Sequence, residues 1–315
     1  MNAPLPWQQE HWLQLSAQIL QNRLPQALLL SGPAGVGKRH FTRALAAFLL
    51  CEARGGQACG ACRSCQQLAA GSHPNLFWLS RLSDDKSGKE KRDIQIEQVR
   101  QLGERLALAS HYDQPKLAVI EPADALNASS ANALLKTIEE PPPRTHLLLV
   151  TERPQSLPAT LRSRCQKLRF GAPPPEIARS WLQQAGGDPR ALEEAQGAPL
   201  QALALSSGDG LQQRLDWARD WLDIARGKLN VLTFAAQVDK DQVADFIDWL
   251  IAWLGRQLQQ SVLGQDGPAS AHSLDLLLGQ ALESRAGLAR NLSPALTVEG
   301  LAILWWRQTR PARGA

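Results

Sequence analysis

The sequence predicts an α/β fold in its first half, built on a parallel sheet covered by helices, and an all-helical region after it. Short apolar runs at 27–30, 116–120 and 147–151 alternate with segments of helical periodicity, and this alternation is typical of a parallel sheet buried on both faces. After about residue 210 only helical apolar stripes remain. At 315 residues the chain is long for one core, so we expect two or three domains.

Composition and charge exclude few functions. The formal charge of +4, from 34 basic and 30 acidic residues, neither demands nor excludes nucleic acid. The first residues lack the basic and apolar regions of a signal peptide, and no apolar run approaches the length of a membrane span. We therefore expect a cytoplasmic protein that makes no contact with a membrane.

A glycine-rich stretch, GPAGVGKR, lies between the apolar run at 27–30 and a helical pattern. A phosphate-binding loop (P-loop) requires this setting, because glycines allow the tight backbone that aims N–H groups inward and a lysine provides a charge for the phosphates. The residues predicted to bind phosphate are Gly32, Gly35, Gly37 and Lys38. Arg39 stands where a magnesium-binding loop carries a hydroxyl. The alternative interpretation is a plain glycine-rich turn.

Four of the five cysteines lie between residues 51 and 65, in the spacing C-x7-C-x2-C-x2-C. Thiolates at short spacing converge on one tetrahedral zinc ion, so we predict a zinc module at 51–65 with ligands Cys51, Cys59, Cys62 and Cys65. Four protein ligands leave no position for water, which makes the predicted metal structural. Redox chemistry, reduced thiols and a zinc knuckle that touches nucleic acid remain alternatives.

The other segments of the first half complete the predicted sheet domain. The run at 116–120 is followed by Glu121 and Pro122, whereas a working P-loop ATPase ends this strand in acids that hold magnesium and polarise water. A helix is predicted over 127–140 with a cap at Asn127 or Ser129, and a strand over 75–80 reads as buried. The first domain is predicted to end at Phe170.

Two further domains are predicted from composition breaks. The stretch 171–175 (GAPPP) reads as a linker, and short helices up to about residue 207 form a small, lid-sized unit. Six of the ten tryptophans lie in the helices that follow. We interpret them as core residues or as a face that packs against another subunit, and as base-stacking residues only as the less favoured alternative.

Several motifs together resemble those of the delta-prime family of clamp-loader subunits in bacterial DNA polymerase III, within the AAA+ proteins. They are LLC after the P-loop, the CxxCxxC cluster, HPN at 73–75, ANALLKTIEEPP at 131–142 and LRSRC at 161–165. The resemblance spans the chain and implies an AAA+ domain at 1–170, a helical lid at 171–207 and a helical collar at 208–315. It implies a subunit that helps to load the sliding clamp onto primed DNA, within a DNA polymerase complex of nucleotidyltransferase activity.

The resemblance also implies partners and residue roles. Gamma/tau and delta subunits would share a hetero-pentameric ring with this chain. The four clustered cysteines match the family's zinc ligands, and Ser163, Arg164 and Cys165 match its SRC motif. In that motif the arginine enters the ATP site of the adjacent gamma/tau subunit, where a guanidinium stabilises charge on the transferred phosphoryl group.

This chain departs from the active members of the family at three positions of its own site. Arg39 replaces the hydroxyl, Glu121-Pro122 replaces the acidic pair, and Leu200 aligns with a lid arginine. We expect no ATP hydrolysis, while the retained Lys38 leaves ATP binding open. The alternatives are an active, gamma/tau-like ATPase subunit and a stand-alone zinc-dependent binder of nucleic acid.

Overall fold

The structure is a computed structural model that describes residues 3–53, 55–83, 90–108, 114–265, 267–288 and 292–310. Its contacts divide the chain into two compact units. One comprises Met1–Gly186 and Gly197–Gln201, and the other comprises Gly187–Gln196 and Ala202–Ala315. The segment predicted to be a separate lid, 171–207, is thus shared between the two units. The three-domain division stays a prediction.

A five-stranded parallel sheet forms the centre of the first unit, in the order β2-β3-β4-β1-β5. The strands are β1 (Ala27–Ser31), β2 (Leu76–Leu79), β3 (Lys116–Ile120), β4 (Thr145–Thr151) and β5 (Gln166–Arg169). Leu29 of β1 pairs with Leu149 of β4 and Lys167 of β5. The first strand therefore lies inside the sheet, and the loop that follows it opens at the carboxyl ends of its neighbours.

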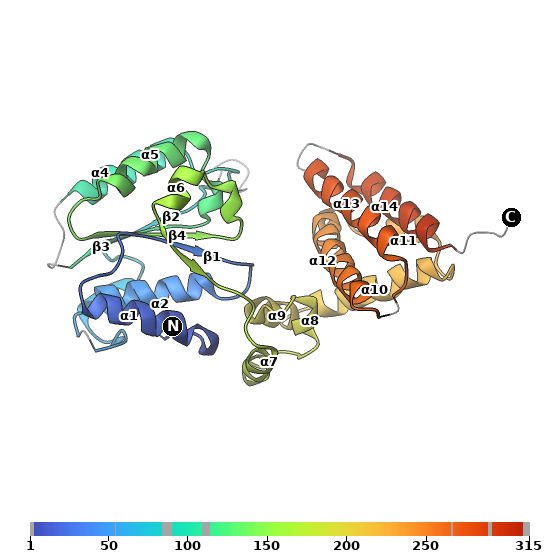
Figure 1. Ribbon diagram of the computed structural model, residues 1–315, viewed down its shortest axis with the longest axis horizontal. Coiled ribbons are helices and arrows are strands. Elements are labelled where there is room, and N and C mark those ends of the chain that lie inside the picture. The colour runs from blue at the N-terminus through green and yellow to red at the C-terminus, as the bar shows by residue number, and fades with distance from the viewer. Residues whose placement is uncertain are drawn as a thin grey trace. The chain divides into compact units, whose positions relative to one another are not determined.

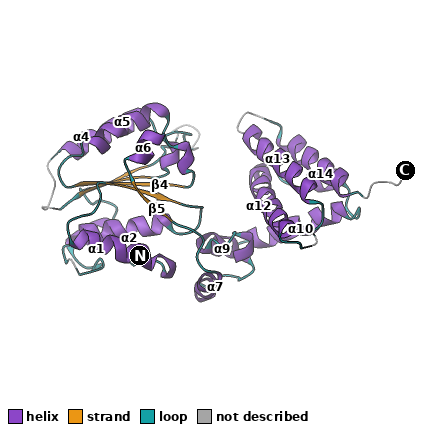
Figure 2. Cartoon of the chain, viewed as in Figure 1, coloured by secondary structure: helices purple, strands orange, loops and turns teal. Residues whose placement is uncertain are grey.

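Helices cover both faces of the sheet, as Figures 1 and 2 show, and the α/β prediction is confirmed. Leu28 and Leu30 pack with α1 (Gln9–Leu20) and α2 (Lys38–Leu50) on one face. Leu29 points the other way, into a cluster with α4 (Ile96–Ala107), α5 (Ala128–Glu139) and α6 (Ala159–Ser163). Alternate side chains of one strand thus anchor both helical layers.

Two local expectations have different outcomes. Asn127 caps α5, because its Oδ1 accepts a hydrogen bond from the Ser130 N–H at 2.9 Å. The strand predicted to be buried, β2, is only half-buried along its whole length. It is an edge strand that pairs with β3 alone, so less of its surface is covered than in the central strands.

Shorter elements complete the first unit. They are the 3₁₀ turns Pro6–Gln8, Ala123–Ala125 and Pro154–Ser156, the helix α3 (Arg63–Ala69) in the cysteine module, and α7 (Pro175–Gln184). The helix α9 (Pro199–Ser206) begins in this unit, where the Leu200 N–H donates to the Gly35 carbonyl at 3.1 Å. That hydrogen bond ties the predicted lid directly to the P-loop.

The second unit is helical, as predicted. It contains α8 (Ala191–Glu194), α10 (Gly210–Ala225), α11 (Val231–Gln237), the 3₁₀ turn Lys240–Gln242, α12 (Val243–Val262), α13 (Ala271–Leu288) and α14 (Pro294–Thr309). Five of its six tryptophans are buried in one core cluster, with Trp221 stacked on Trp305 at 5.7 Å between ring centroids. The interpretation of these tryptophans as core residues is confirmed.

The short helix α8 is fastened to this second core through one acid. Glu194 accepts a hydrogen bond from Trp249 Nε1 at 3.1 Å and pairs with Arg256 at 3.3 Å. A buried carboxylate requires such partners, which explains why this part of the predicted lid belongs to the helical unit. None of the helices in the described ranges combines the length and apolarity that crossing a bilayer requires.

Candidate functional site

The predicted P-loop joins β1 to α2, and close packing explains its glycines. A Cβ at Gly32, where φ is 153°, would lie 2.0 Å from the carbonyl oxygen of Phe170. Gly37 has φ of 90°, and a Cβ there would meet Leu5 at 2.5 Å. Any larger residue at either position would force the surrounding backbone or side chains to move.

The N-terminal turn and the lid occupy the outer side of this loop. Gln8 Nε2 donates to the carbonyls of Val36 and Gly37 at 3.2 and 2.9 Å. Trp7 Nε1 also donates to Val36 O, at 3.0 Å. With the hydrogen bond between Leu200 and Gly35, these contacts hold the backbone of the P-loop through groups of the protein itself.

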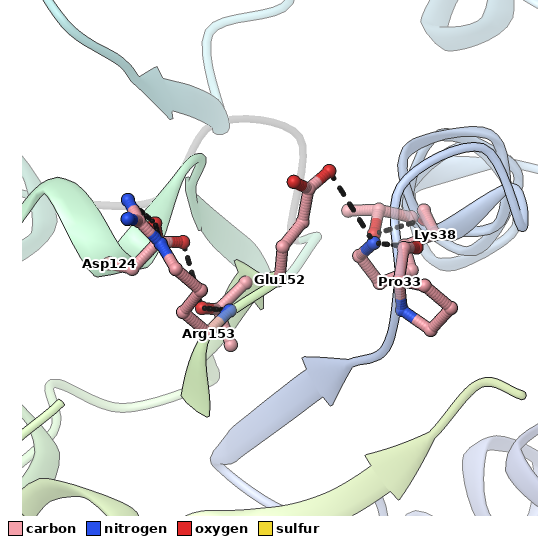
Figure 3. A network of polar contacts seen from close by, with 7 residues as sticks. Pro33, Lys38, Asp124, Glu152 and Arg153 are labelled. Atoms are coloured by element: carbon pink, nitrogen blue, oxygen red, sulfur yellow. Dashed lines mark hydrogen bonds and ion pairs between the residues drawn. The ribbon is translucent and has the colours of Figure 1, made fainter. Parts of the chain in front are cut away.

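Lys38 is buried in this setting, with only 6% of its side chain exposed. Its Nζ donates to the Pro33 carbonyl at 2.6 Å and lies 3.9 Å from a carboxylate oxygen of Glu152, as Figure 3 shows. Burial lowers the pKa of Lys38, against the opposing effect of Glu152 and Glu121. The ammonium group that would contact phosphate is therefore engaged by the protein itself.

Arg39 pairs with the acid that remains at the end of β3. Its Nε lies 3.0 Å from Oε2 of Glu121, in a close ion pair that is not aligned as a hydrogen bond. Glu121 is 16% exposed and Arg39 is 60% exposed. Burial raises the pKa of Glu121, and the charge of Arg39 opposes that shift. A guanidinium thus stands beside the carboxylate that would otherwise face a metal ion.

Asp124 is a second acid in the same place, four residues after the end of β3. Its carboxylate accepts a hydrogen bond from Thr151 Oγ1 at 2.8 Å. It also accepts hydrogen bonds from the Arg153 guanidinium at 2.9 and 3.2 Å, and Figure 3 shows the two side chains facing each other. Burial by itself would raise the pKa of Asp124, but these hydrogen bonds outweigh it, and the pKa is lowered. The acid is ionised and already neutralised by a cation.

These residues line a pocket of about 430 Å³ at the carboxyl ends of β1, β3 and β4. The lining includes Gly35, Gly37, Lys38, Arg39, Glu121, Pro122, Asp124, Thr151, Glu152, Arg153 and Leu200. Leu200, at the position aligned with a lid arginine, brings no charge to it. Three acids line the pocket, and each lies within 4 Å of a cationic side chain of the same chain.

The four clustered cysteines come together as the sequence predicts. Their sulfur atoms all lie within 4.8 Å of one another, against roughly 3.8 Å expected for a tetrahedral site with Zn–S bonds of about 2.3 Å. Backbone N–H groups point at three of the sulfurs, with distances of 3.3 to 3.4 Å. N–H donors from Ala61 and Cys62 lower the pKa of Cys59 to about 6, which favours the thiolate that binds metal.

His73 of the HPN segment helps to fix the cysteine module to α2. The Asn75 N–H donates to Nδ1 of His73, so Nε2 carries the proton and donates to Ser64 Oγ at 2.9 Å. Ser64 in turn donates to the carbonyl of Leu50, at the end of α2. Burial lowers the pKa of His73, which keeps this ring neutral. The chain of hydrogen bonds links the helix that carries Cys65 to the helix that delivers Cys51.

Arg164 lies apart from the pocket lining, at the C-terminal end of α6. Its side chain is 42% exposed, and its Nε lies 2.7 Å from Oε1 of Glu139 at the end of α5. Nη1 donates to the Thr160 carbonyl at 3.0 Å. Ser163 Oγ donates to the same carbonyl, while Cys165 is buried and its burial raises the pKa of the thiol to about 11. The predicted finger is thus held at a surface, in contact with an acid.

Sequence reasoning missed four residues of these sites: Asp124, Glu152, Arg153 and Glu139. Glu152 and Arg153 directly follow one predicted strand, and Asp124 lies four residues after another. All three are at the edge where ligands bind in α/β sheets, so their position was a usable signal. Glu139 had no such signal, because its pairing with Arg164 depends on how two helices pack.

The chain is similar in sequence to known subunits of DNA polymerase III. Residues 7–174 match the family model described as DNA polymerase III, delta subunit. The DNA polymerase III subunit delta' of Pseudomonas aeruginosa is 31% identical, with 95% of this chain and 96% of that protein aligned. The corresponding protein of Haemophilus influenzae is also 31% identical, over 83% of this chain and 79% of its own length.

More distant relatives belong to other subunits. DNA polymerase III subunit tau of Escherichia coli is 28% identical over 97% of this chain and 46% of its own length. Among solved structures, a gamma subunit-related protein from Thermotoga maritima aligns with 95% of this chain and 99% of its own, with a TM-score of 0.49 and 14% identity.

Proposed function

This chain belongs to the delta-prime family of DNA polymerase III subunits. We propose that it is a clamp-loader subunit that hydrolyses no ATP in its own pocket. Its place is in a ring with gamma/tau and delta subunits, which loads the sliding clamp onto primed DNA. Such a subunit works in the bacterial cytoplasm. The proposed division of labour is an AAA+ domain at 1–170, a lid at 171–207 and a collar at 208–315.

The ion pair between Arg39 and Glu121 carries the proposal that the pocket is inactive. Magnesium in a P-loop site requires oxygen ligands, from the hydroxyl at the eighth loop position and an acid at the end of the neighbouring strand. Here the eighth position is a guanidinium, 3.0 Å from that acid. A magnesium ion would have to displace Arg39 and tolerate its charge nearby, and Pro122 provides no group to polarise water.

ATP turnover by the purified chain tests this part directly. We expect no turnover above that of a Lys38→Ala variant, measured by phosphate release with magnesium present. Hydrolysis that disappears in the variant would contradict the proposal and favour an active, gamma/tau-like subunit. ATP binding is a separate question, because Lys38 and the glycines of the loop remain in place.

We assign Arg164 as a finger that acts on the nucleotide of an adjacent gamma/tau subunit, within the SRC motif with Ser163 and Cys165. Its exposure and its position at the end of a helix anchored in the core support this role. A loader reconstituted with Arg164→Ala should lose the ATP turnover of the adjacent site and should load clamps less efficiently, since a finger contributes on the order of 10³-fold or more at its site. Unchanged turnover would contradict the assignment.

The four cysteines would hold a structural zinc ion. Their number, their spacing and the N–H donors aimed at their sulfurs fit a site with four thiolate ligands. The metal would hold the loop between Cys51 and Cys65 and would supply no catalytic water.

The assembly can be measured with purified subunits. Mixing this chain with gamma/tau and delta should give one complex of defined mass in native mass spectrometry. Tight, salt-dependent DNA binding by the isolated chain, with no complex formed, would instead favour a separate nucleic-acid binder.

A further inference from the structure

We propose that Glu139 is a positioning residue for Arg164. Its carboxylate contacts Nε while the Thr160 carbonyl accepts a hydrogen bond from Nη1, and together they fix the plane of the guanidinium so that Nη2 can meet a phosphate group on the nucleotide of a neighbouring subunit. The inference rests on the proposed finger role of Arg164 and adds a second residue to it.

The two contacts of Arg164 lie on different edges of its guanidinium, because Nε shares an edge with Nη2 while Nη1 lies on the other edge. Nε is paired with Glu139 at 2.7 Å, and Nη1 donates to Thr160 O at 3.0 Å. Within the described ranges, Nη2 donates no hydrogen bond. A guanidinium has five N–H donors in a rigid plane, so contacts at Nε and Nη1 determine the direction in which Nη2 points.

Both partners stand on backbone that the core holds in place. Ile138, next to Glu139, and Cys165, next to Arg164, are buried in the same hydrophobic cluster. On the far side of Cys165 the chain enters β5, where Gln166 pairs with Leu28. The ion pair therefore joins two fixed points and spans the surface between α5 and α6.

Stability alone does not account for an acid at this position. Glu139 is the last residue of α5, and the adjacent Glu140 is a second acid at the same end. The negative end of a helix disfavours carboxylates, and half-exposed ion pairs add little to the free energy of folding. With 47% of its side chain exposed, Glu139 gains little from burial. The contact is better explained by what it does to Arg164.

The opposite role, a latch that withholds Arg164 from its target, predicts a different result. Removing a latch would raise turnover, whereas removing a positioning contact lowers it. Because Glu139 contacts Nε and Thr160 contacts Nη1, Nη2 can bind a phosphate without breaking the ion pair, and this geometry favours positioning.

The test uses the complete loader, reconstituted from this chain, gamma/tau and delta, with primed DNA and clamp. Glu139→Gln is compared with Glu140→Gln, a matched control that removes the neighbouring charge, and with Arg164→Ala. Turnover remaining in Arg164→Ala measures the contribution of other sites and is subtracted. We expect Glu139→Gln to lower kcat of the Arg164-dependent turnover roughly ten- to a hundredfold, with KM for ATP unchanged, because misplacing a catalytic group by about 1 Å has an effect of this order. Glu140→Gln should stay within about twofold of the wild type.

A second measurement separates the ion pair from the finger. The Nε–H signal of Arg164, identified in the free full-length chain by its loss in Arg164→Lys, should shift and exchange faster with water in Glu139→Gln but not in Glu140→Gln. If Arg164→Ala reduces turnover while Glu139→Gln keeps or raises it, positioning is overturned and the finger stands. If Arg164→Ala changes nothing, both ideas fail, and an unchanged Nε–H signal in Glu139→Gln refutes the pairing by itself.

Discussion

Replacing Arg39 by glutamine removes the cation that faces the carboxylate of Glu121 while keeping a side chain of similar length. Glu121 is 16% exposed, and burial already raises its pKa above the ordinary value of 4.5. Without Arg39 the pKa should rise further, although Arg43 and Lys38 still contribute favourable charge. The native state would then hold an ionised, largely buried acid with weaker compensation.

The magnitude follows from the 3.0 Å separation of the two charged atoms. Coulomb's law gives about 1.4 kcal/mol in water and about 5.5 kcal/mol at an effective dielectric constant of 20. Because Arg39 is 60% exposed, solvent screening brings the value toward the lower figure. We expect the Arg39→Gln variant to lose about 1 to 2 kcal/mol in the free energy of unfolding at neutral pH.

The pH dependence has a definite sign. A carboxyl whose folded pKa is raised binds more protons in the native state, so stability falls as pH rises from 4.5 through the folded pKa. In Arg39→Gln the folded pKa of Glu121 is higher, so the pH range over which stability falls extends to higher pH. The difference from the wild type should be full at neutral pH and should vanish below pH 4.5, where Glu121 is protonated in both folded and unfolded chains.

Urea denaturation of four chains measures this coupling: wild type, Arg39→Gln, Glu121→Gln and the double variant. The double variant should recover most of the loss, because no buried charge remains to be compensated. Arg43→Gln, on the same helix, is the matched control and should cost less. A loss in Arg39→Gln that is equal at pH 4 and pH 7, or that Glu121→Gln does not suppress, would refute the ion pair as the cause.

Three further predictions concern the metal module, a buried histidine and the helical core. The reduced chain should contain about one zinc ion by elemental analysis, and serine at any one of the four cysteines should lower that content; metal-free wild type would contradict the site. Burial lowers the pKa of His146 from 6.5, so the unfolded chain takes up its proton first and stability should fall as pH drops below 6.5; His146→Gln should flatten this part of the profile measured by denaturation. Trp221→Ala removes a fully buried ring and should cost about 3 to 5 kcal/mol, with loss of near-ultraviolet dichroism; a loss under 1 kcal/mol would mean that the ring is not in the core.

The fold was largely predictable, because it depends on local periodicity. Apolar runs marked the central strands, and Asn127 marked the start of α5. The exposure of β2 was not predictable, because a strand's position in the sheet order depends on pairing between distant segments. The sharing of the lid between two units depends on Glu194, whose partners lie more than 50 residues away along the chain.

The cysteine cluster could be predicted from the sequence, whereas the ion pairs of the pocket could not. The cysteine spacing predicted the cluster, since four ligands within fifteen residues leave few arrangements. The pairing of Arg39 with Glu121 joins residues 82 positions apart, and the sequence showed only that each was unusual at its place. The motif alone predicted that the pocket has neither the magnesium-binding hydroxyl nor the second acid. The ion pairs that Glu121, Asp124 and Glu152 make with cationic side chains depend on the fold, and only the structure shows them.

The retained glycines of the P-loop need a separate explanation from the altered residues. At Gly32 and Gly37 a side chain would collide with Phe170 and Leu5, whether or not a nucleotide is present. At Gly32 the close backbone contact, and at Gly37 the positive φ, favour glycine for structural reasons, so these glycines do not by themselves indicate nucleotide binding. Arg39 is 60% exposed, and Arg39 and Pro122 occupy positions where magnesium-dependent hydrolysis would have required a hydroxyl and an acid. A phosphate entering the pocket would have to compete with Glu152 for Lys38 and could gain nothing from a metal ion at Glu121 while Arg39 remains there. In this pocket, the altered residues are therefore a better guide to function than the retained glycines.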